Sequence, residues 1–134
     1  MRPRYAAIAS AENALVFASE TGARRETGSG ASLARAHAAL DAVDAKIRAF
    51  GGTTTPSRYL GECHRAHDGA CFGYASCART RMILEYEEDV GERTVREDFD
   101  RLAEAYAEAV CDAFGEVGGR MEGNAKFRRA VAAL

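Results

Sequence analysis

Hydrophobic residues recur at steps of three and four between positions 32 and 50, which is the period of one face of an α-helix. This apolar stripe consists of Leu33, Ala36, Leu40, Val43, Ile47 and Phe50. Ser32 is suited to cap the first turn, and Gly51 and Gly52 permit the left-handed backbone with which many helices end. The pattern therefore predicts a helix over 32–50 that packs one side on a core.

The opposite face of this predicted helix carries small residues. At about 100° per residue, it gathers Ala34, Ala38, Asp41, Ala42, Ala45 and Ala49. Asp41 has no Lys or Arg three or four residues later, and only His37, one turn before it, could pair with it. Two interpretations stay open. The alanines can reflect composition, since Ala is the best helix former, or they can offer a flat surface where a partner approaches closely and supplies a cation to Asp41.

Short apolar runs predict two β-hairpins. The runs 4–10 and 14–19 are separated by only a few residues, as in two strands joined by a tight connection. The runs 58–66 and 70–76 flank an Asp-Gly pair, which is a strong turn signal. The polar, glycine-containing segment 21–30 between the first hairpin and the first helix is expected to be a loop.

A fifth strand is predicted over 81–87. Met82, Ile83 and Leu84 are consecutive there, which is typical of a central strand that is covered on both faces. The three successive strands from residue 58 onward are connected by short turns, so we expect an antiparallel meander.

Two more helices follow. A helix over 94–114 is indicated by a capping box, Thr94 with Glu97, and by a core stripe of Val95, Phe99, Leu102, Tyr106, Val110 and Ala113. Its other face is expected to be solvated and acidic, with Glu97, Asp98, Asp100, Arg101, Glu104 and Glu108. Asn124 is a candidate cap for a last helix, whose apolar positions are Phe127, Ala130, Val131 and Leu134.

The predicted order of elements is therefore ββαβββαα, an α+β fold. One five-stranded antiparallel sheet must cover both of its faces, so the first helix is expected on one face and the last two on the other. The 134 residues contain no internal repeat and no long linker, which predicts a single domain over 1–134.

Composition narrows the classes of function. The net charge is -2 and the arginines are interleaved with acids, so there is no footprint for nucleic acid or for an anionic membrane surface. No apolar run approaches the length of a membrane span. Glu12 and Asn13 interrupt the apolar start of the chain, which argues against a secretory signal and favours a cytoplasmic protein. The four cysteines are too few and too irregular for a disulfide framework and are expected to be reduced.

One cluster, Cys63, His64, His67 and Cys71, has the residue types of a metal or nucleophile site. Zinc needs four converging ligands, whereas successive residues of a strand alternate between its faces, so we expect no metal here. No phosphate loop, nucleotide fingerprint, serine elbow or zincin helix is found either. The residues thus predict a non-enzyme without a cofactor, and they favour an interaction module.

Four strings in this chain resemble the sedlin family, the small longin-like subunits of the transport protein particle (TRAPP) tethering complex. They are HAALDAVDAKI (37–47), YLG (59–61), FGY (72–74) and RMILEYEED (81–89). The resemblance covers nearly the whole chain from Arg4 to Leu134 and favours the subunit-2-like branch over sedlin itself. It departs at 112–117, where the family's Asn-Pro-Phe-Tyr turn is replaced by residues without a proline. The conformation of that loop and any contact through it are not carried over.

The resemblance implies a longin-like (profilin-like) fold and a non-catalytic subunit of a complex that activates Rab-type GTPases by nucleotide exchange. Such a subunit contacts other core subunits and a large subunit, and is peripherally associated with membranes between the endoplasmic reticulum and the Golgi. In the family, the first aspartate of the helix motif is associated with partner assembly, and it matches Asp41. The predicted partner-binding residues are Asp41, Ala38, Ala42 and Ala45. Asp44 is expected near the core edge, paired with Arg48 one turn later.

Two other functions compete with this one. The first is a stand-alone longin-like regulatory or ligand-binding domain, with a pocket between the sheet and the last two helices. The second is a thiol or zinc enzyme that uses Cys63 and His67.

Overall fold

A computed structural model of the chain describes residues 3–10, 15–20, 29–49, 58–66, 69–75, 80–87, 89–111 and 125–134. The elements follow in the order β1 (Tyr5–Ala9), β2 (Leu15–Glu20), α1 (Ser29–Ala49), β3 (Arg58–Ala66), β4 (Gly69–Ala75), β5 (Arg81–Tyr86), α2 (Glu92–Cys111) and α3 (Ala125–Ala132). The predicted order ββαβββαα is confirmed. In this part of the chain, no helix combines the length and the apolar character needed to cross a bilayer.

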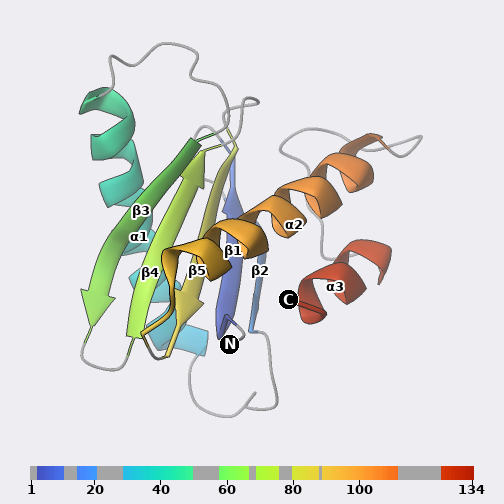
Figure 1. The fold of residues 1–134 in the computed structure, drawn as a ribbon, viewed down its shortest axis with the longest axis horizontal. Helices are drawn as coiled ribbons and strands as arrows, with labels where there is room; N and C mark the ends of the chain where they lie inside the picture. Colours follow the sequence, from blue (N-terminus) through green and yellow to red (C-terminus); the bar gives the residue numbers. More distant parts are fainter. Residues whose placement is uncertain are drawn as a thin grey trace.

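The strands form one antiparallel sheet in the order β2-β1-β5-β4-β3, so the last strand in sequence lies at the centre. This position explains the run Met82, Ile83 and Leu84. Their side chains alternate between the two faces, and all three are buried because both faces are covered. Figure 1 shows α1 behind the sheet and α2 in front of it, with α3 beside α2, and α3 shares the core of the α2 side. The predicted α+β layering is therefore confirmed.

Each face of the sheet has its own core. On the α1 side, Ala36, Ala39, Leu40 and Val43 pack against Tyr5, Ala7, Ala9, Leu60, Cys71, Ala75 and Ile83. On the other side, α2 and α3 contribute Val95, Phe99, Leu102, Tyr106, Ala109, Phe127 and Val131, which pack together with Leu134 against Ala6, Ile8, Val16, Phe17, Met82, Leu84 and Tyr86. Alternate residues of β1 and β5 thus supply the two cores in turn.

Both long helices begin earlier than predicted. Because α1 begins at Ser29, Ser32 lies inside the helix and the predicted cap is wrong. Because α2 begins at Glu92, Thr94 also lies within the first turn, and the predicted capping box is wrong. The first turn of α2 is instead supported by two surface ion pairs, Arg96–Glu92 at 2.9 Å and Arg93–Glu97 at 3.1 Å. The predicted cap at Asn124 lies outside the described residues.

Asp98 does not belong to the solvated face of α2, as the sequence pattern predicted, but is only 4% exposed. The hydroxyl of Tyr86 donates a hydrogen bond to Asp98 Oδ2 at 2.6 Å. A buried carboxylate is tolerated when a donor satisfies it, and β5 supplies that donor here. Burial and the hydrogen bond to Asp98 raise the pKa of Tyr86, so its hydroxyl keeps its proton at physiological pH.

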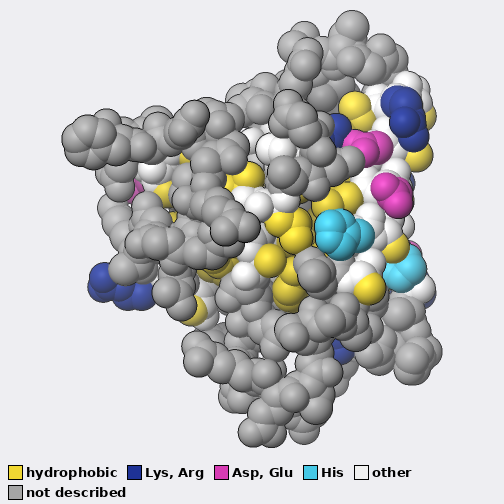
Figure 2. Space-filling model, turned by 180° about the vertical axis from the view of Figure 1, so that it is seen from behind, with side chains coloured by type: hydrophobic (Ala, Val, Ile, Leu, Met, Phe, Trp, Pro, Cys, Tyr) yellow, Lys and Arg dark blue, Asp and Glu magenta, His cyan; other side chains and the backbone are white. Residues whose placement is uncertain are grey.

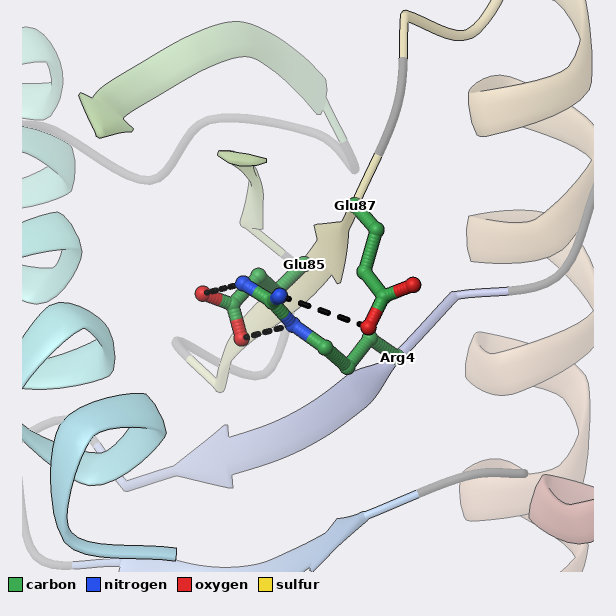
Figure 3. Close-up of polar contacts among 3 residues, drawn as sticks. All are labelled: Arg4, Glu85 and Glu87. Carbon is green, nitrogen blue, oxygen red and sulfur yellow. Dashed lines mark hydrogen bonds and ion pairs between the residues drawn. The ribbon is translucent and has the colours of Figure 1, made fainter. Parts of the chain in front are cut away.

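The N-terminal strand is fixed to the centre of the sheet by a partly buried ion pair. Glu85 of β5 has no exposed surface, and its Oε1 accepts from Arg4 Nη2 at 2.9 Å while its Oε2 accepts from Arg4 Nε at 3.3 Å. Arg4 Nη1 reaches Glu87 Oε1 at 3.5 Å, as Figure 3 shows. These two charge-assisted hydrogen bonds balance the negative charge of Glu85 and fix the position of the Arg4 side chain.

Candidate functional site

The small-residue face of α1 turns away from the sheet. We call it the α1 flank, and it consists of Ala34, Ala38, Asp41, Ala42, Ala45 and Ala49. Ala34, Asp41, Ala45 and Ala49 are exposed, and Ala38 and Ala42 are half-buried. Figure 2 looks at the molecule from the side of α1 and shows hydrophobic side chains there, with acidic and histidine side chains among them. The flank is therefore reachable from outside the domain.

The core side of α1 explains why the flank faces outward. Leu40 and Val43 are fully buried, and Ile47 packs against the same core. At about 100° per residue, these positions lie on the side of the helix opposite Asp41 and Ala45. The side chains of the predicted stripe residues Leu33 and Phe50 lie outside the described part of the chain.

Asp41 is an exposed carboxylate. Within the described part of the chain it makes no side-chain hydrogen bond or ion pair, and His37 one turn before it is exposed as well. A hydrated carboxylate of this kind can accept from a cation that a partner supplies, and such a pair gains strength when the interface excludes water. The partner-binding role of Ala38, Asp41, Ala42 and Ala45 stays a prediction.

The second acid of the helix motif has a structural contact. Asp44 forms an ion pair with Arg81 of β5, with 2.7 Å between Oδ1 and Nη2, whereas the sequence predicted Arg48 as its partner. Arg81 Nη1 also donates to the carbonyl oxygen of Ser10, at 3.0 Å. A local three- or four-residue rule could not find this contact, because its partner lies on a strand far along the chain.

Lys46, which the sequence analysis missed, makes a second contact of this kind. Its Nζ donates to the carbonyl oxygens of Leu60 at 2.7 Å and Glu62 at 2.9 Å. Both acceptors belong to β3, whose pairing with β4 shifts register twice, and Gly61 between them has a φ of 79°. The one sequence signal was the glycine within a strand, since an isolated glycine often marks a bulge.

A second candidate feature is a small pocket between α2 and the strands β3 and β4. Tyr59, Tyr74, Arg96 and Asp100 line it, and its volume is about 200 Å³. The two tyrosines are opposite each other in the β3–β4 ladder. Arg96 lies over the ring of Tyr59, with 4.7 Å from Cζ to the ring centroid. Burial and the neighbouring charge of Glu92 raise the pKa of Tyr59, so its hydroxyl is protonated at neutral pH.

The cysteine and histidine cluster is not gathered into a metal site in the part of the chain that the structure describes. No group of three or more His, Cys, Asp or Glu side chains is placed there to hold an ion. Cys63 is half-buried and Cys71 is buried, while His67 lies outside the described residues. Burial raises the pKa of the Cys63 thiol, although Lys46 opposes this shift, and a thiol that keeps its proton is a weak nucleophile.

Comparison with known proteins finds similarity over most of the chain. The family model described as Sedlin matches residues 8–134. Trafficking protein particle complex subunit 2-like proteins of Bos taurus, Rattus norvegicus and Taeniopygia guttata are each 27% identical over 94 residues. The aligned part is 66% of this chain and 68% of each relative. The match is thus not confined to the helix motif.

Proposed function

The chain belongs to the sedlin family, and on that premise we propose that it is a non-catalytic small subunit of a TRAPP complex. Its relatives carry the name of a trafficking complex subunit, and its sheet with one helix on one face and two on the other has the longin-like arrangement. Its task in this proposal is assembly: it binds neighbouring subunits, including a large one. Nucleotide exchange on a Rab-type GTPase belongs to the other subunits.

The observation that carries this proposal is the outward-facing α1 flank with its exposed Asp41. Alanine side chains let a second backbone come close, because the distance between packed helices depends on the side chains at the contact. A partner cation would pair with Asp41 as the contact closes, which fixes the orientation of the two subunits more than it adds affinity. The flank would form the centre of a larger interface, since stable interfaces bury roughly 800 Å² on each partner.

Replacing Asp41 by a large ring tests this site. We expect Asp41→Tyr to leave the unfolding midpoint of the isolated chain unchanged, because the position is exposed, and to reduce co-purification of the other complex subunits from cells. Glu104→Tyr is the matched control: it places the same ring at an exposed acid of α2, on the other side of the sheet. Co-purification of Asp41→Tyr at the wild-type level would contradict the site assignment.

The proposed setting is transport between the endoplasmic reticulum and the Golgi, with the protein in the cytoplasm and held at these membranes only through the complex. Fluorescent tagging gives the measurement. The tagged chain is expected at Golgi and pre-Golgi structures, and Asp41→Tyr is expected to spread through the cytoplasm. Wild-type protein that is uniformly diffuse would contradict this setting.

The pocket between α2 and the sheet favours one alternative, a longin-like domain that works alone and binds a small ligand. Size-exclusion chromatography of a native cell extract separates the two. A TRAPP subunit elutes with a large assembly, whereas a free domain elutes near its own mass of 14.4 kDa. Elution only at the larger size would exclude the stand-alone function.

A further inference from the structure

Two polar contacts hold α1 to the sheet at opposite edges of its buried side. We propose that Asp44 and Lys46 are positioning residues, which set the rotation of α1 about its own axis and thereby the direction in which the α1 flank faces. The importance of this direction for assembly rests on the proposed function. The structural claim itself concerns the isolated chain.

The helical geometry places the two residues at the borders of the core side. At 3.6 residues per turn, Asp44 and Lys46 are separated by about 200° in one direction and about 160° in the other. The narrower sector contains the core residues Ala36, Ala39, Leu40, Val43 and Ile47. The wider sector contains the residues of the α1 flank. Each contact therefore stands at one of the two boundaries between the core side and the flank.

The contact on the Asp44 side is anchored to the middle of the sheet. Arg81, the first residue of the central strand, pairs with Asp44 at 2.7 Å and also donates to the carbonyl oxygen of Ser10 at 3.0 Å. The side chain of Arg81 is 14% exposed and that of Asp44 is 22% exposed. This partial burial shields the pair from solvent, so the contact resists displacement better than a surface ion pair does.

The contact on the Lys46 side is anchored to the edge strand β3. The ammonium group donates to the carbonyl oxygens of Leu60 and Glu62, and these charge-assisted bonds are stronger than neutral ones. The shifts of register in β3 supply the geometry, because a bulge bends a strand and redirects its groups. Gly61 lies between the two acceptors, and a Cβ added there would be 3.8 Å from Lys46 Nζ.

Apolar burial alone specifies this rotation weakly. Alanines lie on the core side, as Ala36 and Ala39, and also in the flank, as Ala38 and Ala42. The apolar character of α1 is consequently less concentrated on one side of the helix than that of α2. Leu40 and Val43 hold α1 on the sheet, but a modest rotation exchanges alanine for alanine at little cost in buried area. The hydrogen bonds of Lys46 and the ion pair of Asp44 oppose this rotation.

Alanine-methyl NMR of the isolated chain tests the rotation directly. A soluble paramagnetic agent relaxes exposed methyl groups, and the ratio between Ala42, near Lys46, and Ala34, toward Asp44, reports how the helix is turned. We expect this ratio to shift in Lys46→Met, which keeps the aliphatic stem, and in Asp44→Asn. Lys46→Arg should restore the wild-type ratio. Arg48→Met is the matched control, because Arg48 is an exposed base in the same part of α1.

The outcomes separate this proposal from the proposed function. If the ratio stays at its wild-type value in both Lys46→Met and Asp44→Asn, even with a lower unfolding midpoint, the two residues are merely stabilising and the proposal is overturned. If the ratio shifts, the proposal holds. Co-purification then tests the function: we expect a roughly tenfold loss of association in the same variants. A shifted ratio with unchanged co-purification would count against the flank as the interface and not against the positioning role.

Discussion

The two faces of the sheet are built from different kinds of side chain. The α2–α3 side is filled with rings: Phe17 meets Phe127 edge to face at 4.9 Å, and Tyr74 stacks on Phe99 at 5.5 Å. The α1 side combines alanines with aliphatic side chains, and Tyr5 is the one aromatic ring among its described core residues. Its helix is also held by the contacts of Asp44 with Arg81 and of Lys46 with β3. Large rings fix the positions of their helices by shape, since cores are close-packed. On the side with smaller residues, polar contacts take over part of that task.

The largest expected effect is on the ring-filled side. Phe99 is fully buried and contacts both Tyr59 and Tyr74. Phe99→Ala is expected to lower the free energy of unfolding by about 3–5 kcal/mol, because it removes a ring and leaves a cavity. Denaturant unfolding followed by circular dichroism measures this loss. A cost below that of any substitution on the α1 side would contradict the division between the two faces.

The next effect probes how closely α1 approaches the sheet. A Cβ added to Gly73 would lie 2.6 Å from Val43 Cγ2 and 2.7 Å from Cys63 Sγ. Gly73→Ala is therefore expected to cost up to about 3 kcal/mol, as overpacking typically does. Val43→Ala frees space at this contact. The double variant Gly73→Ala/Val43→Ala should therefore lose less stability than the sum of the losses in the two single variants. Strict additivity of the two substitutions would show that Val43 is not the obstacle.

A smaller effect is expected at the border between β5 and α2. Tyr86→Phe removes the hydrogen bond to Oδ2 of the buried Asp98 and leaves only the ion pair of Oδ1 with Arg101, which should cost about 1–2 kcal/mol. The pH dependence has a definite sign. The pKa of Tyr86 is raised in the folded chain, so the unfolded chain loses this proton first, near pH 10, and stability falls as the pH rises beyond that value. Urea titrations between pH 8 and about 11 should show a shallower fall in Tyr86→Phe. Equal slopes would contradict this account.

The smallest effect on stability is expected at the α1 flank. Asp41→Asn should change the free energy of unfolding by less than about 0.5 kcal/mol, because the side chain is exposed. The substitution should instead weaken co-purification of the other subunits, because it removes the charge with which a partner cation would pair. A substantial loss of stability in the isolated chain would mean that Asp41 serves the fold and not a partner.

Patterns of short range predicted the elements well. The steps of three and four residues between apolar positions located α1 and α2. The consecutive residues Met82, Ile83 and Leu84 identified the central strand from the sequence alone. The errors arose where a local motif competed with packing. Ser32 and Thr94 are good caps by type, yet both helices extend beyond them toward the N-terminus.

Contacts between distant segments were beyond local reasoning. An acid at position 98 looks solvated until the hydroxyl of Tyr86 is placed beside it. The roles of Asp44 and Lys46 depend on Arg81 and on two carbonyl groups of β3, and neither spacing nor charge pattern identifies such partners. The α1 flank was found from sequence because its signal, alanines around one acid, lies within a single helix.

The bulged edge strand has a consequence for how the molecule associates. Edge strands invite other chains to add to the sheet, and proteins protect them with bulges and lysines. In β3 two carbonyl groups are already occupied by Lys46, and the irregular register gives an incoming strand no continuous ladder to extend. Addition of another strand at this edge is thereby discouraged, and Lys46 contributes to this protection as well as to the attachment of α1.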